Sequence, residues 1–355
     1  MHEGIRVLVL GTGQMGSGIA RLILNKPGLA LVGAHGRRRA RAGIDLGGAI
    51  GLDREVGIAI SADLESTVAR TQPHIAIQAT CSRLTDALPE ITTVVRNRVP
   101  VISIAEEMAY PAATSPAIAA ELDRLARAHG VAVVGAGINP GFVLDLLVIT
   151  LSGVCADIRS ITARRVNDLS PYGPSVLTTQ GIGLTPEAFR RGVEDGSVVG
   201  HFGFPQSIRM IADTLGWEIE GIEERREPIV SAVRRTTPFV TVEPGTVAGC
   251  LHTAVAFASG EPVISLIHPQ QIHPHLEGVE TGDSIEIAGT PSVRLAGSPE
   301  IPGGVGTIAL AVNLIPRVLS AAPGLHSMAD LPVPAAVLGD VRRHLRETQR
   351  EPRHA

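Results

Sequence analysis

Residues 5–135 show apolar runs and helical patterns in regular alternation. Residues 5–10 (IRVLVL) form a continuous apolar, β-branched run that is typical of a strand buried on both faces. Apolar residues then recur with helical spacing at Met15, Ile19, Leu22 and Ile23. The same reasoning predicts strands at 29–34, 57–60, 74–79, 101–104 and 131–134, and helices at 85–97 and 117–129. Strands that alternate with helices of this length predict an α/β fold with a doubly wound parallel sheet of the Rossmann type.

The pattern changes near residue 139. We expect a helix at 141–151, followed by strands at 158–166, 247–257, 263–268, 284–287 and 293–295 and helices at 186–193 and 206–215. This mixture predicts a second, α+β domain with a mixed sheet over residues 139–302. Residues 303–319 form an apolar helical pattern that we expect to return to the first domain. The first domain is then residues 1–138, completed by C-terminal helices of about 303–355, with a charged, loose tail from residue 342.

Three glycines separate the first strand from the first helix. Gly11, Gly13 and Gly16 have G-x-G-x-x-G spacing, which permits a tight turn, a close approach of a pyrophosphate and close packing of helix on sheet. A helix that begins here points free backbone N–H groups at the phosphates. The sequence therefore predicts a dinucleotide site with contacts from Gly11, Gly13, Gln14, Met15 and Gly16.

The end of the second strand lacks the carboxylate that often binds the ribose 2′-hydroxyl of NAD. It carries His35 instead, and Arg37, Arg38 and Arg39 follow. This pattern favours the 2′-phosphate of NADP(H), with Arg37 as the leading contact and the next two arginines behind it. NAD(H) is the alternative cofactor, and a solvated basic loop is the alternative interpretation. At the sheet's other carboxyl ends and the domain junction we expect cofactor contacts from Thr80, Ala105 and Asn139.

Composition restricts the class of protein. The 355 residues are 44% hydrophobic and 19% charged, and the net charge is −4, which predicts a globular protein without a basic surface for nucleic acid. Neither a membrane-spanning apolar run nor a signal-peptide pattern is present in the sequence. Three widely spaced cysteines do not suggest a disulfide framework. We therefore expect a cytoplasmic protein that binds neither nucleic acid nor membrane.

One compositional detail restricts the chemistry. Of the 31 basic residues, only Lys26 is a lysine. Arginine stays protonated at working pH, so it binds anions but does not act as a general base. Lys26 lies at the end of the first helix, where it complements the helix dipole. A mechanism with a catalytic lysine is therefore not expected.

Glu106 and Glu107 directly follow a predicted strand at the ligand-binding edge of the sheet. A carboxylate beside a nicotinamide can hold ammonia and transfer protons to or from a developing amine. Strand alternation would send the two side chains in opposite directions, so we expect only one to face the cleft, with Glu107 favoured over Glu106. The alternative is a pair of carboxylates stabilised by the start of a helix.

The predicted substrate pocket combines polar groups with apolar walls. Asn139 either contacts the ligand or caps the following helix. The pocket residues that we predict are Asn139, Pro140, Phe142, Asn167, Tyr172, Gln180, His201, Phe202 and His268. No metal site is expected in the histidine-rich segment 268–277, because its spacing matches no helical H-x-x-x-H pair and two prolines interrupt it.

These motifs together resemble the 2,4-diaminopentanoate dehydrogenase family, which includes the native amine dehydrogenases. The resemblance extends from Gly11 to about Pro334 and rests on GTGQMGSGIA, SIAEEMAYP, GINPGFVLDLLVITLSGVC, RVNDLSPYGP, TQGIGLTPEAF, EPGTVAGC, HPQQIHPHLEGVETGDSIEI and EIPGGVGTIALAVNLIP. It implies an N-terminal fold like that of dihydrodipicolinate reductase and a C-terminal domain that builds a dimer and the active site. It also implies reversible oxidative deamination with NAD(P)+ and a functional glutamate in the AEEM stretch.

The expected function is therefore an NAD(P)-dependent amine dehydrogenase, an oxidoreductase acting on CH–NH2 groups. Its partners would be a small amine or ketone, ammonia and a second copy of the chain in a homodimer. The amine would be like 2,4-diaminopentanoate, or small and aliphatic or cyclic. The alternatives are an imine reductase like dihydrodipicolinate reductase and a non-catalytic dinucleotide sensor. The lack of lysines disfavours the first, because that reductase relies on a catalytic lysine.

Overall fold

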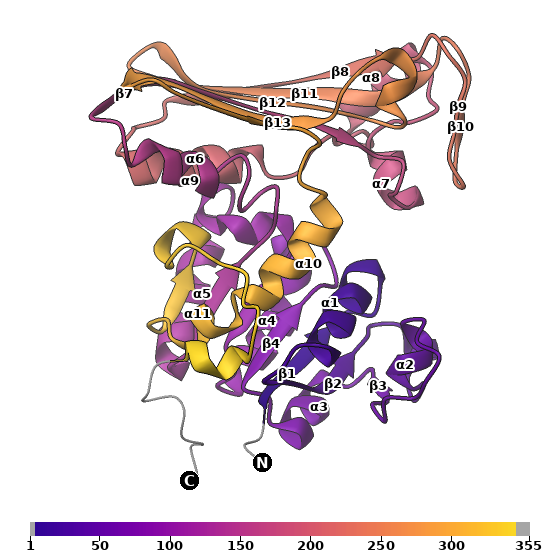
Figure 1. Cartoon of the computed structure of the whole chain (residues 1–355), viewed down its shortest axis with the longest axis vertical. Helices are drawn as coiled ribbons and strands as arrows, with labels where there is room; N and C mark the ends of the chain where they lie inside the picture. Colours follow the sequence, from indigo (N-terminus) through magenta and orange to yellow (C-terminus); the bar gives the residue numbers. More distant parts are fainter. Residues whose placement is uncertain (1–3, 346–355) are drawn as a thin grey trace. The chain divides into compact units, whose positions relative to one another are not determined.

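A computed structural model describes residues 4–345 of the chain, so residues 346–355 of the predicted loose tail lie outside the described part. The chain divides into two compact units (Figure 1). The first contains the residues up to Phe142 and the segment from Gly303 onward, and the second is Val143–Pro302. No helix in the described residues is long and apolar enough to cross a membrane.

The first unit is built on a sheet of seven parallel strands in the order β15-β6-β5-β4-β1-β2-β3. The strands are β1 (Ile5–Leu10), β2 (Leu29–His35), β3 (Ile60–Ser61), β4 (Ile75–Gln78), β5 (Val101–Ser103), β6 (Ala132–Gly135) and β15 (Gly324–His326). The chain winds outward from β1 through β2 and then returns to place β4 on the other side of β1. Ligands bind at the carboxyl ends of strands where the winding reverses in this way, so the loop after β1 is the expected ligand site.

Helices complete the first unit. They are α1 (Gln14–Leu24), α2 (Leu46–Ala49), α3 (Leu64–Thr71), α4 (Leu84–Arg96), α5 (Pro116–His129), α10 (Gly303–Asn313) and α11 (Ile315–Leu319), with short 3-10 helices between them. Val7, Leu8, Val9 and Leu10 of β1 are fully buried, as a central strand covered on both faces requires. The C-terminal segment packs on this unit: a Cβ on Gly18 of α1 would meet Ile308 of α10 at 2.2 Å, so these two helices pack closely.

The second unit contains a six-stranded mixed sheet in the order β14-β13-β7-β12-β11-β8, plus a two-stranded ribbon. Only β7 and β12 run parallel to each other. The strands are β7 (Asp157–Asp168), β8 (Gly221–Val230), β11 (Val247–Ala258), β12 (Glu261–Gln271), β13 (Gly282–Thr290) and β14 (Val293–Gly297), with β9 (Arg235–Thr236) and β10 (Thr241–Val242) in the ribbon. The helices are α6 (Leu146–Ser152), α7 (Pro174–Thr179), α8 (Pro186–Asp195) and α9 (Phe204–Leu215). In Figure 1, α6 and α9 lie against one face of the sheet. The predicted fold class is confirmed.

Several predicted elements were wrong in detail. The helix expected at 141–151 begins only at Leu146, because Gly141 has a φ of +126° and the side chain of Asp145 caps the helix by accepting a hydrogen bond from the Leu146 amide. Residues 303–319 form two helices, with Pro316 in the first turn of the second. Strand β8 was not predicted, because its sequence GIEERREPIV is dominated by charged residues, which an edge strand tolerates.

Candidate functional site

The glycine loop has the geometry that a dinucleotide site requires. Gly11 has a φ of +111°, and a Cβ there would meet the Ala79 carbonyl oxygen at 2.4 Å. A Cβ on Gly16 would meet the Gly11 carbonyl oxygen at 2.0 Å, whereas a Cβ on Gly13 would meet nothing within 4 Å. Helix α1 begins at Gln14, directly after this open position. Gly11 and Gly16 are thus required by packing. Gly13 leaves space in which a pyrophosphate fits against the N-terminus of the helix.

A chain of hydrogen bonds connects the end of β4, helix α4 and the loop after β2 in the first unit. The Gln78 amide donates to the hydroxyl of Thr80 at 2.7 Å, and the Thr80 hydroxyl donates to Oε2 of Glu90 on α4. Arg37 Nε, just beyond β2, donates to Oε1 of Glu90 at 2.7 Å. This ion pair raises the pKa of the Arg37 guanidinium above its usual value. Arg37 is therefore held in one orientation by α4.

Arg37 keeps part of its guanidinium available. Its Nη2 donates to the Asp86 carbonyl at 2.6 Å, and no contact of Nη1 is found among the described residues. The Arg38 side chain is exposed and, in the part of the chain that the structure describes, makes no hydrogen bond or ion pair. Arg41, which sequence analysis missed, donates from Nη1 to the Thr12 carbonyl at 2.8 Å and so braces the glycine loop. These residues fit a cofactor with an anionic group beside the second strand.

His35 ends β2 at the position where NAD-binding folds often have a carboxylate. Its ring is buried, its Nε2 lies 3.7 Å from Oε1 of Glu90, and its Nδ1 has no partner among residues 4–345. Burial lowers the pKa of His35 below 6.5, so the ring is neutral at neutral pH. A buried, unpartnered ring nitrogen is a hydrogen-bonding group available to a ligand.

Glu106 and Glu107 lie in a 3-10 helix, η2 (Glu106–Ala109), and not in a strand, so the alternation argument used to distinguish them was wrong. Glu107 Oε2 accepts a hydrogen bond of 2.7 Å from the backbone amide of Leu84, the first residue of α4. Its carboxylate thereby satisfies an N-terminal amide that Arg83, the N-cap residue, does not satisfy with its own side chain. Glu107 has the structural role of a helix cap.

Glu106 has a different environment. Burial raises the pKa of its carboxyl above the usual value, while hydrogen bonds from its own backbone amide and the Ser82 side chain act in the opposite direction. The neighbouring Glu107 charge raises that pKa further. A carboxyl whose pKa is shifted toward neutrality is suited to proton transfer. Glu107 thus caps a helix, whereas Glu106 is the glutamate with the raised pKa.

Lys26 contacts the C-terminal segment of the chain. Its Nζ donates a hydrogen bond to the Val337 carbonyl of the C-terminal segment. The lysine therefore fastens that segment within the first unit.

In the second unit, two predicted pocket histidines come together. The rings of His201 and His268 lie 5.0 Å apart between centroids, in an edge-to-face arrangement. His268 Nδ1 donates to the Arg165 carbonyl at 2.7 Å, which leaves the lone pair on Nε2. Burial, reinforced by the Arg165 charge, lowers the pKa of His268 to about 3. Burial also lowers the pKa of His201 well below 6.5. Both rings are therefore neutral at neutral pH.

Asn167, Gln180 and Gln270 form a polar group in the same unit. Asn167 of β7 is the register partner of Gln270 on β12, and the Gln270 amide donates weakly to Gln180 Oε1 at 3.4 Å. Gln180 also donates to the Gly200 carbonyl at 2.7 Å, so its amide supports the fold directly. Oδ1 of Asn167 and Nε2 of His201 are buried without a partner in the described residues.

Asn139 is not a helix cap, because α6 is capped by Asp145. Both polar atoms of its side chain are buried and unpartnered within residues 4–345, while Pro140 is buried and Phe142 half-buried. Of the other predicted residues, Ala105 is buried, Phe202 is half-buried, and Tyr172 packs against a small apolar cluster that includes Leu169 and Ile182. The charged residues near the histidines are already paired: Arg165 Nη1 contacts Asp283 at 2.7 Å, and Arg226 contacts Glu224 at 2.7 Å.

The five buried side-chain atoms that lack a partner in the described chain belong to four residues, His35, Asn139, Asn167 and His201. The sequence had selected all four as ligand contacts. It had missed Glu90, which is remote from the glycine motif in sequence. Helix α4 packs against β4 and β5, and from there the Glu90 side chain reaches His35 and Arg37. A polar residue on the buried face of the predicted helix 85–97 was the available indication.

Comparison with known proteins adds independent information. Residues 142–347 match the family model of the 2,4-diaminopentanoate dehydrogenase C-terminal domain, and residues 5–103 match that of the dihydrodipicolinate reductase N-terminus. The chain is 45% identical over 344 residues to a 2,4-diaminopentanoate dehydrogenase of Acetoanaerobium sticklandii, covering 96% of this chain and 97% of that protein. An amine dehydrogenase of Streptomyces virginiae is 26% identical over 94% of this chain and 98% of its own length.

The fold is also similar to a solved structure. The amine dehydrogenase from Mycobacterium smegmatis superposes with a TM-score of 0.83 at 28% identity, covering 93% of this chain and 97% of that one. The similarity therefore includes both units of the chain.

Proposed function

We propose that this chain, which belongs to the 2,4-diaminopentanoate dehydrogenase family, catalyses the reversible, NADP(H)-preferring oxidative deamination of a small amine with Glu106 as the proton carrier. The chain is an NAD(P)-dependent oxidoreductase acting on CH–NH2 groups, an amine dehydrogenase. The proposal concerns the cofactor preference, the proton carrier, the substrate and the oligomeric state.

The observation that carries the proposal is the distribution of unsatisfied buried polar atoms. Leaving a buried donor or acceptor unpaired costs about 1–3 kcal/mol, so such atoms are rare unless a ligand satisfies them. Here they occur on His35, next to the cofactor-binding edge, and on Asn139, Asn167 and His201. The four residues with unsatisfied buried side-chain atoms in the described chain are thus all among those that the sequence motifs predict as ligand contacts.

The preference for NADP(H) is supported by charge. Arg37 and Arg38 follow β2, and the strand end carries a neutral histidine in place of a carboxylate. A carboxylate there would repel a 2′-phosphate, whereas the Arg37 guanidinium can donate to it. When bound, the nicotinamide supplies the hydride acceptor or donor for the carbon that bears the nitrogen. Gly13, the first turn of α1, Arg37 and Arg38 would hold the dinucleotide.

The role of Glu106 follows from its raised pKa. In the direction of deamination, the substrate amine must lose a proton and hydride leaves its carbon, which yields an iminium ion. Water then adds to that carbon and ammonia leaves, so one carboxylate that accepts a proton from water and donates it to the departing nitrogen serves both steps. The net reaction consumes amine, NADP+ and water and yields the ketone or aldehyde, ammonia, NADPH and one proton.

The substrate is proposed to be 2,4-diaminopentanoate or a small aliphatic or cyclic amine. The neutral rings of His201 and His268 and the amide of Asn167 offer uncharged hydrogen-bonding groups. Arg165, which could have bound a substrate carboxylate, is buried and already contacts Asp283 and the Ile301 carbonyl. This arrangement suits the amine or carbonyl end of a substrate better than its carboxylate.

The proposal includes a cytoplasmic homodimer. On one face of the second unit's sheet, alternate residues Leu251, Val255 and Phe257 of β11 and Ile267 of β12 remain half-buried, and strand register places them on the same face. A sheet face with apolar residues at this spacing can pack against a second copy of the chain. Light scattering after size exclusion would give the mass of the assembly.

The direct test is NADPH formation from NADP+ with 2,4-diaminopentanoate and with small aliphatic or cyclic amines, and ketone plus ammonia in reverse. Dihydrodipicolinate with NADPH serves as the comparison for an imine reductase. We expect turnover only with the amines and their carbonyl products. Turnover of dihydrodipicolinate without ammonia would favour the imine reductase, and binding of NADPH without any turnover would favour the dinucleotide sensor.

A further inference from the structure

We infer that Asp168, His273 and His275 form a binding site for a divalent transition-metal cation in the second unit. One potential ligand atom from each residue lies within 4.8 Å of the others. Asp168 ends β7, whereas the histidines lie in the segment after β12, so about a hundred residues separate the two parts of the site. The spacing and the prolines of segment 268–277 had predicted no metal site, and Asp168 lies outside that segment.

The tautomer of His273 is the one that metal binding requires. Its Nε2 lies 2.9 Å from the carbonyl oxygen of Thr236, which can only accept, so Nε2 carries the proton and Nδ1 keeps its lone pair. A metal-ligating histidine characteristically donates its other ring N–H to a carbonyl or carboxylate in this way. The Thr236 carbonyl thus fixes the orientation of the ring and leaves Nδ1 as the ligand.

The backbone of His273 is held in an unusual conformation. Its φ is +45°, in the left-handed region that residues with a side chain rarely adopt. Its amide donates to Asp168 Oδ1 at 3.1 Å and to the Ser170 hydroxyl at 2.8 Å. Such conformations persist where surrounding contacts fix them, and they cluster at binding sites. Here the fixed backbone places the His273 ring beside the Asp168 carboxylate.

Asp168 has a free carboxylate oxygen. All of its side-chain hydrogen bonds, from the amides of Ser170 and His273 and the hydroxyl of Ser170, go to Oδ1. Oδ2 therefore keeps its lone pairs within the described chain. His275, in the following 3-10 helix η4 (Pro274–Glu277), is exposed, and its ring lies 5.6 Å from that of His273 between centroids.

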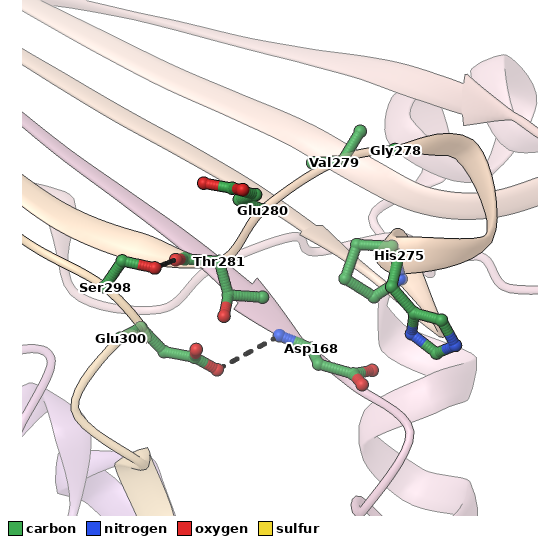
Figure 2. Close-up of a pocket in the computed structure, with 9 residues that line it drawn as sticks. Asp168, His275, Gly278, Val279, Glu280, Thr281, Ser298 and Glu300 are labelled. Atoms are coloured by element: carbon green, nitrogen blue, oxygen red, sulfur yellow. Dashed lines mark hydrogen bonds between the residues drawn. The ribbon is translucent and has the colours of Figure 1, made fainter.

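The surroundings favour a cation. Figure 2 shows Asp168, His275, Glu280 and Glu300 around a pocket of about 640 Å³ whose nine lining residues include three carboxylates and no lysine or arginine. The charge of Arg235 interacts with that of Asp168, but the Arg235 guanidinium is bound by Glu277, Gln271 and the Ile272 carbonyl. The charge of Arg235 is thereby offset by a neighbouring carboxylate.

The ligand set determines the class of metal. Two imidazoles and one carboxylate suit zinc, cobalt or nickel, whereas calcium and magnesium prefer oxygen ligands. Bonds of about 2.0–2.1 Å in a tetrahedral site place ligand atoms roughly 3.3 Å apart. Because His275 is exposed, a change in its rotamer can bring its ring inward by the remaining distance of about 1–1.5 Å.

The experiment uses the full chain without an affinity tag, stripped of metal with a chelator. Calorimetric titration with Zn²⁺ and Co²⁺ is combined with the visible absorption of bound Co²⁺ and with thermal unfolding. We expect one ion per chain, a Co²⁺ spectrum with nitrogen ligands, and a rise in Tm of several degrees at saturation.

Variants identify the ligands. His275→Asn, an exposed change, and Asp168→Asn should each weaken the binding of Zn²⁺ and Co²⁺ at least about tenfold. His326→Asn is the matched control, because His326 is a partly exposed histidine of the first unit whose Nε2 also contacts a backbone carbonyl. Binding without saturation, or saturable binding that both ligand variants leave unchanged, would overturn the proposal. Weaker binding in His326→Asn as well would show ions held diffusely by surface histidines and would equally overturn it.

Discussion

Glu90 Oε1 accepts a hydrogen bond from Arg37 Nε at 2.7 Å, which joins helix α4 to the end of strand β2. The carboxylate is almost fully buried, and the Thr80 hydroxyl donates to its second oxygen. The arginine proposed to recognise the 2′-phosphate is consequently both oriented and partly neutralised by a residue remote from the glycine motif. Two predictions concern this pair.

Replacing Arg37 with alanine should weaken NADP+ much more than NAD+. A hydrogen bond from a guanidinium to a phosphate contributes about 1.5–3 kcal/mol, so we expect the Kd for NADP+ to rise at least about tenfold. The Kd for NAD+ should change less than about twofold, because NAD+ has a hydroxyl at this position. Nucleotide fluorescence titration gives both constants. Arg124→Ala, an exposed arginine of α5, is the control, and equal losses for both cofactors would contradict the assignment.

The substitution Glu90→Gln removes the negative charge while keeping the shape of the side chain. The 2′-phosphate then no longer experiences repulsion from this carboxylate, and Arg37 keeps its full charge for the ligand. We expect the Kd for NADP+ to fall a few-fold, consistent with the interaction of about 1 kcal/mol between two unit charges about 4 Å apart at the dielectric constant of water. The gain should shrink at high salt. A weaker NADP+ complex would show that orientation of Arg37 by Glu90 outweighs the charge.

The glycine loop allows a separation of binding from stability. A methyl group on Gly13 meets nothing in the described protein, so Gly13→Ala should unfold at nearly the same temperature as the wild type. It should nevertheless weaken either dinucleotide at least about tenfold, because the phosphate approaches the backbone there. Gly16→Ala should instead destabilise the fold, since its Cβ would lie 2.0 Å from the Gly11 carbonyl oxygen. Unaltered binding by Gly13→Ala would refute the predicted phosphate position.

Substitutions of the two glutamates in the AEEM stretch should have different effects, one on activity and the other on stability. Glu106→Gln should lower kcat by about 10²–10⁴-fold with little loss of stability, as expected for removal of a proton carrier. Glu107→Gln should keep most of the activity and lower the free energy of unfolding by about 1 kcal/mol, because its carboxylate caps α4 through the Leu84 amide. Steady-state kinetics and denaturant unfolding of both variants test this, and the reverse pattern would assign the chemistry to Glu107.

The raised pKa of Glu106 predicts a pH dependence of the wild-type enzyme. The protonated carboxyl cannot accept a proton, so kcat/KM for amine oxidation should decline as the pH falls through this raised pKa. A profile that keeps the same decline in a variant with residual activity, Glu106→Gln, would exclude this carboxyl as its source.

The histidines of the second unit make stability sensitive to acid. The pKa of His268 is about 3 in the folded chain, against 6.5 as the ordinary value. Below pH 6.5 the unfolded chain therefore binds a proton that the folded chain does not, and stability falls as the pH drops from 6.5 toward 3. The slope is at most about 1.4 kcal/mol per pH unit for each such histidine. The lowered pKa values of His201 and His252 act in the same direction.

Denaturant unfolding between pH 4 and 8 measures this dependence. His268→Gln should reduce the slope below pH 6.5 by about one proton relative to the wild type. His326→Asn, a substitution of a partly exposed histidine in the first unit, is the control. A wild-type free energy of unfolding that stays constant from pH 7 to pH 4 would contradict the neutral, buried state of these rings.

Local patterns in the sequence determined the first unit well. The apolar run of β1, the glycine spacing and the helical pattern of α1 each depend on residues close together in the chain, so strand, turn and helix could be predicted with nearly correct ends. The same holds for the parallel sheet, because a helix between two strands carries the chain back to the edge where the first strand began, which favours parallel pairing. The local pattern did not predict β8, whose sequence is mostly charged and has no apolar periodicity. It also placed the start of α6 too early, because Gly141 and Asp145 prevent helix before Leu146.

Only the tertiary structure decided which side chains meet. Glu106 and Glu107 are adjacent and chemically identical, and the sequence favoured Glu107. The packing of α4 beside η2 instead gives Glu107 a capping role and leaves Glu106 half-buried with a raised pKa. Glu90 meets Arg37, and Asp168 meets His273, across 53 and 105 positions of sequence. Such pairs depend on the register of strands and the docking of helices, which are set by the whole core rather than by any local motif. The sequence by itself thus determined the fold class and the family of chemistry, while the assignment of individual carboxylates and histidines required their three-dimensional neighbours.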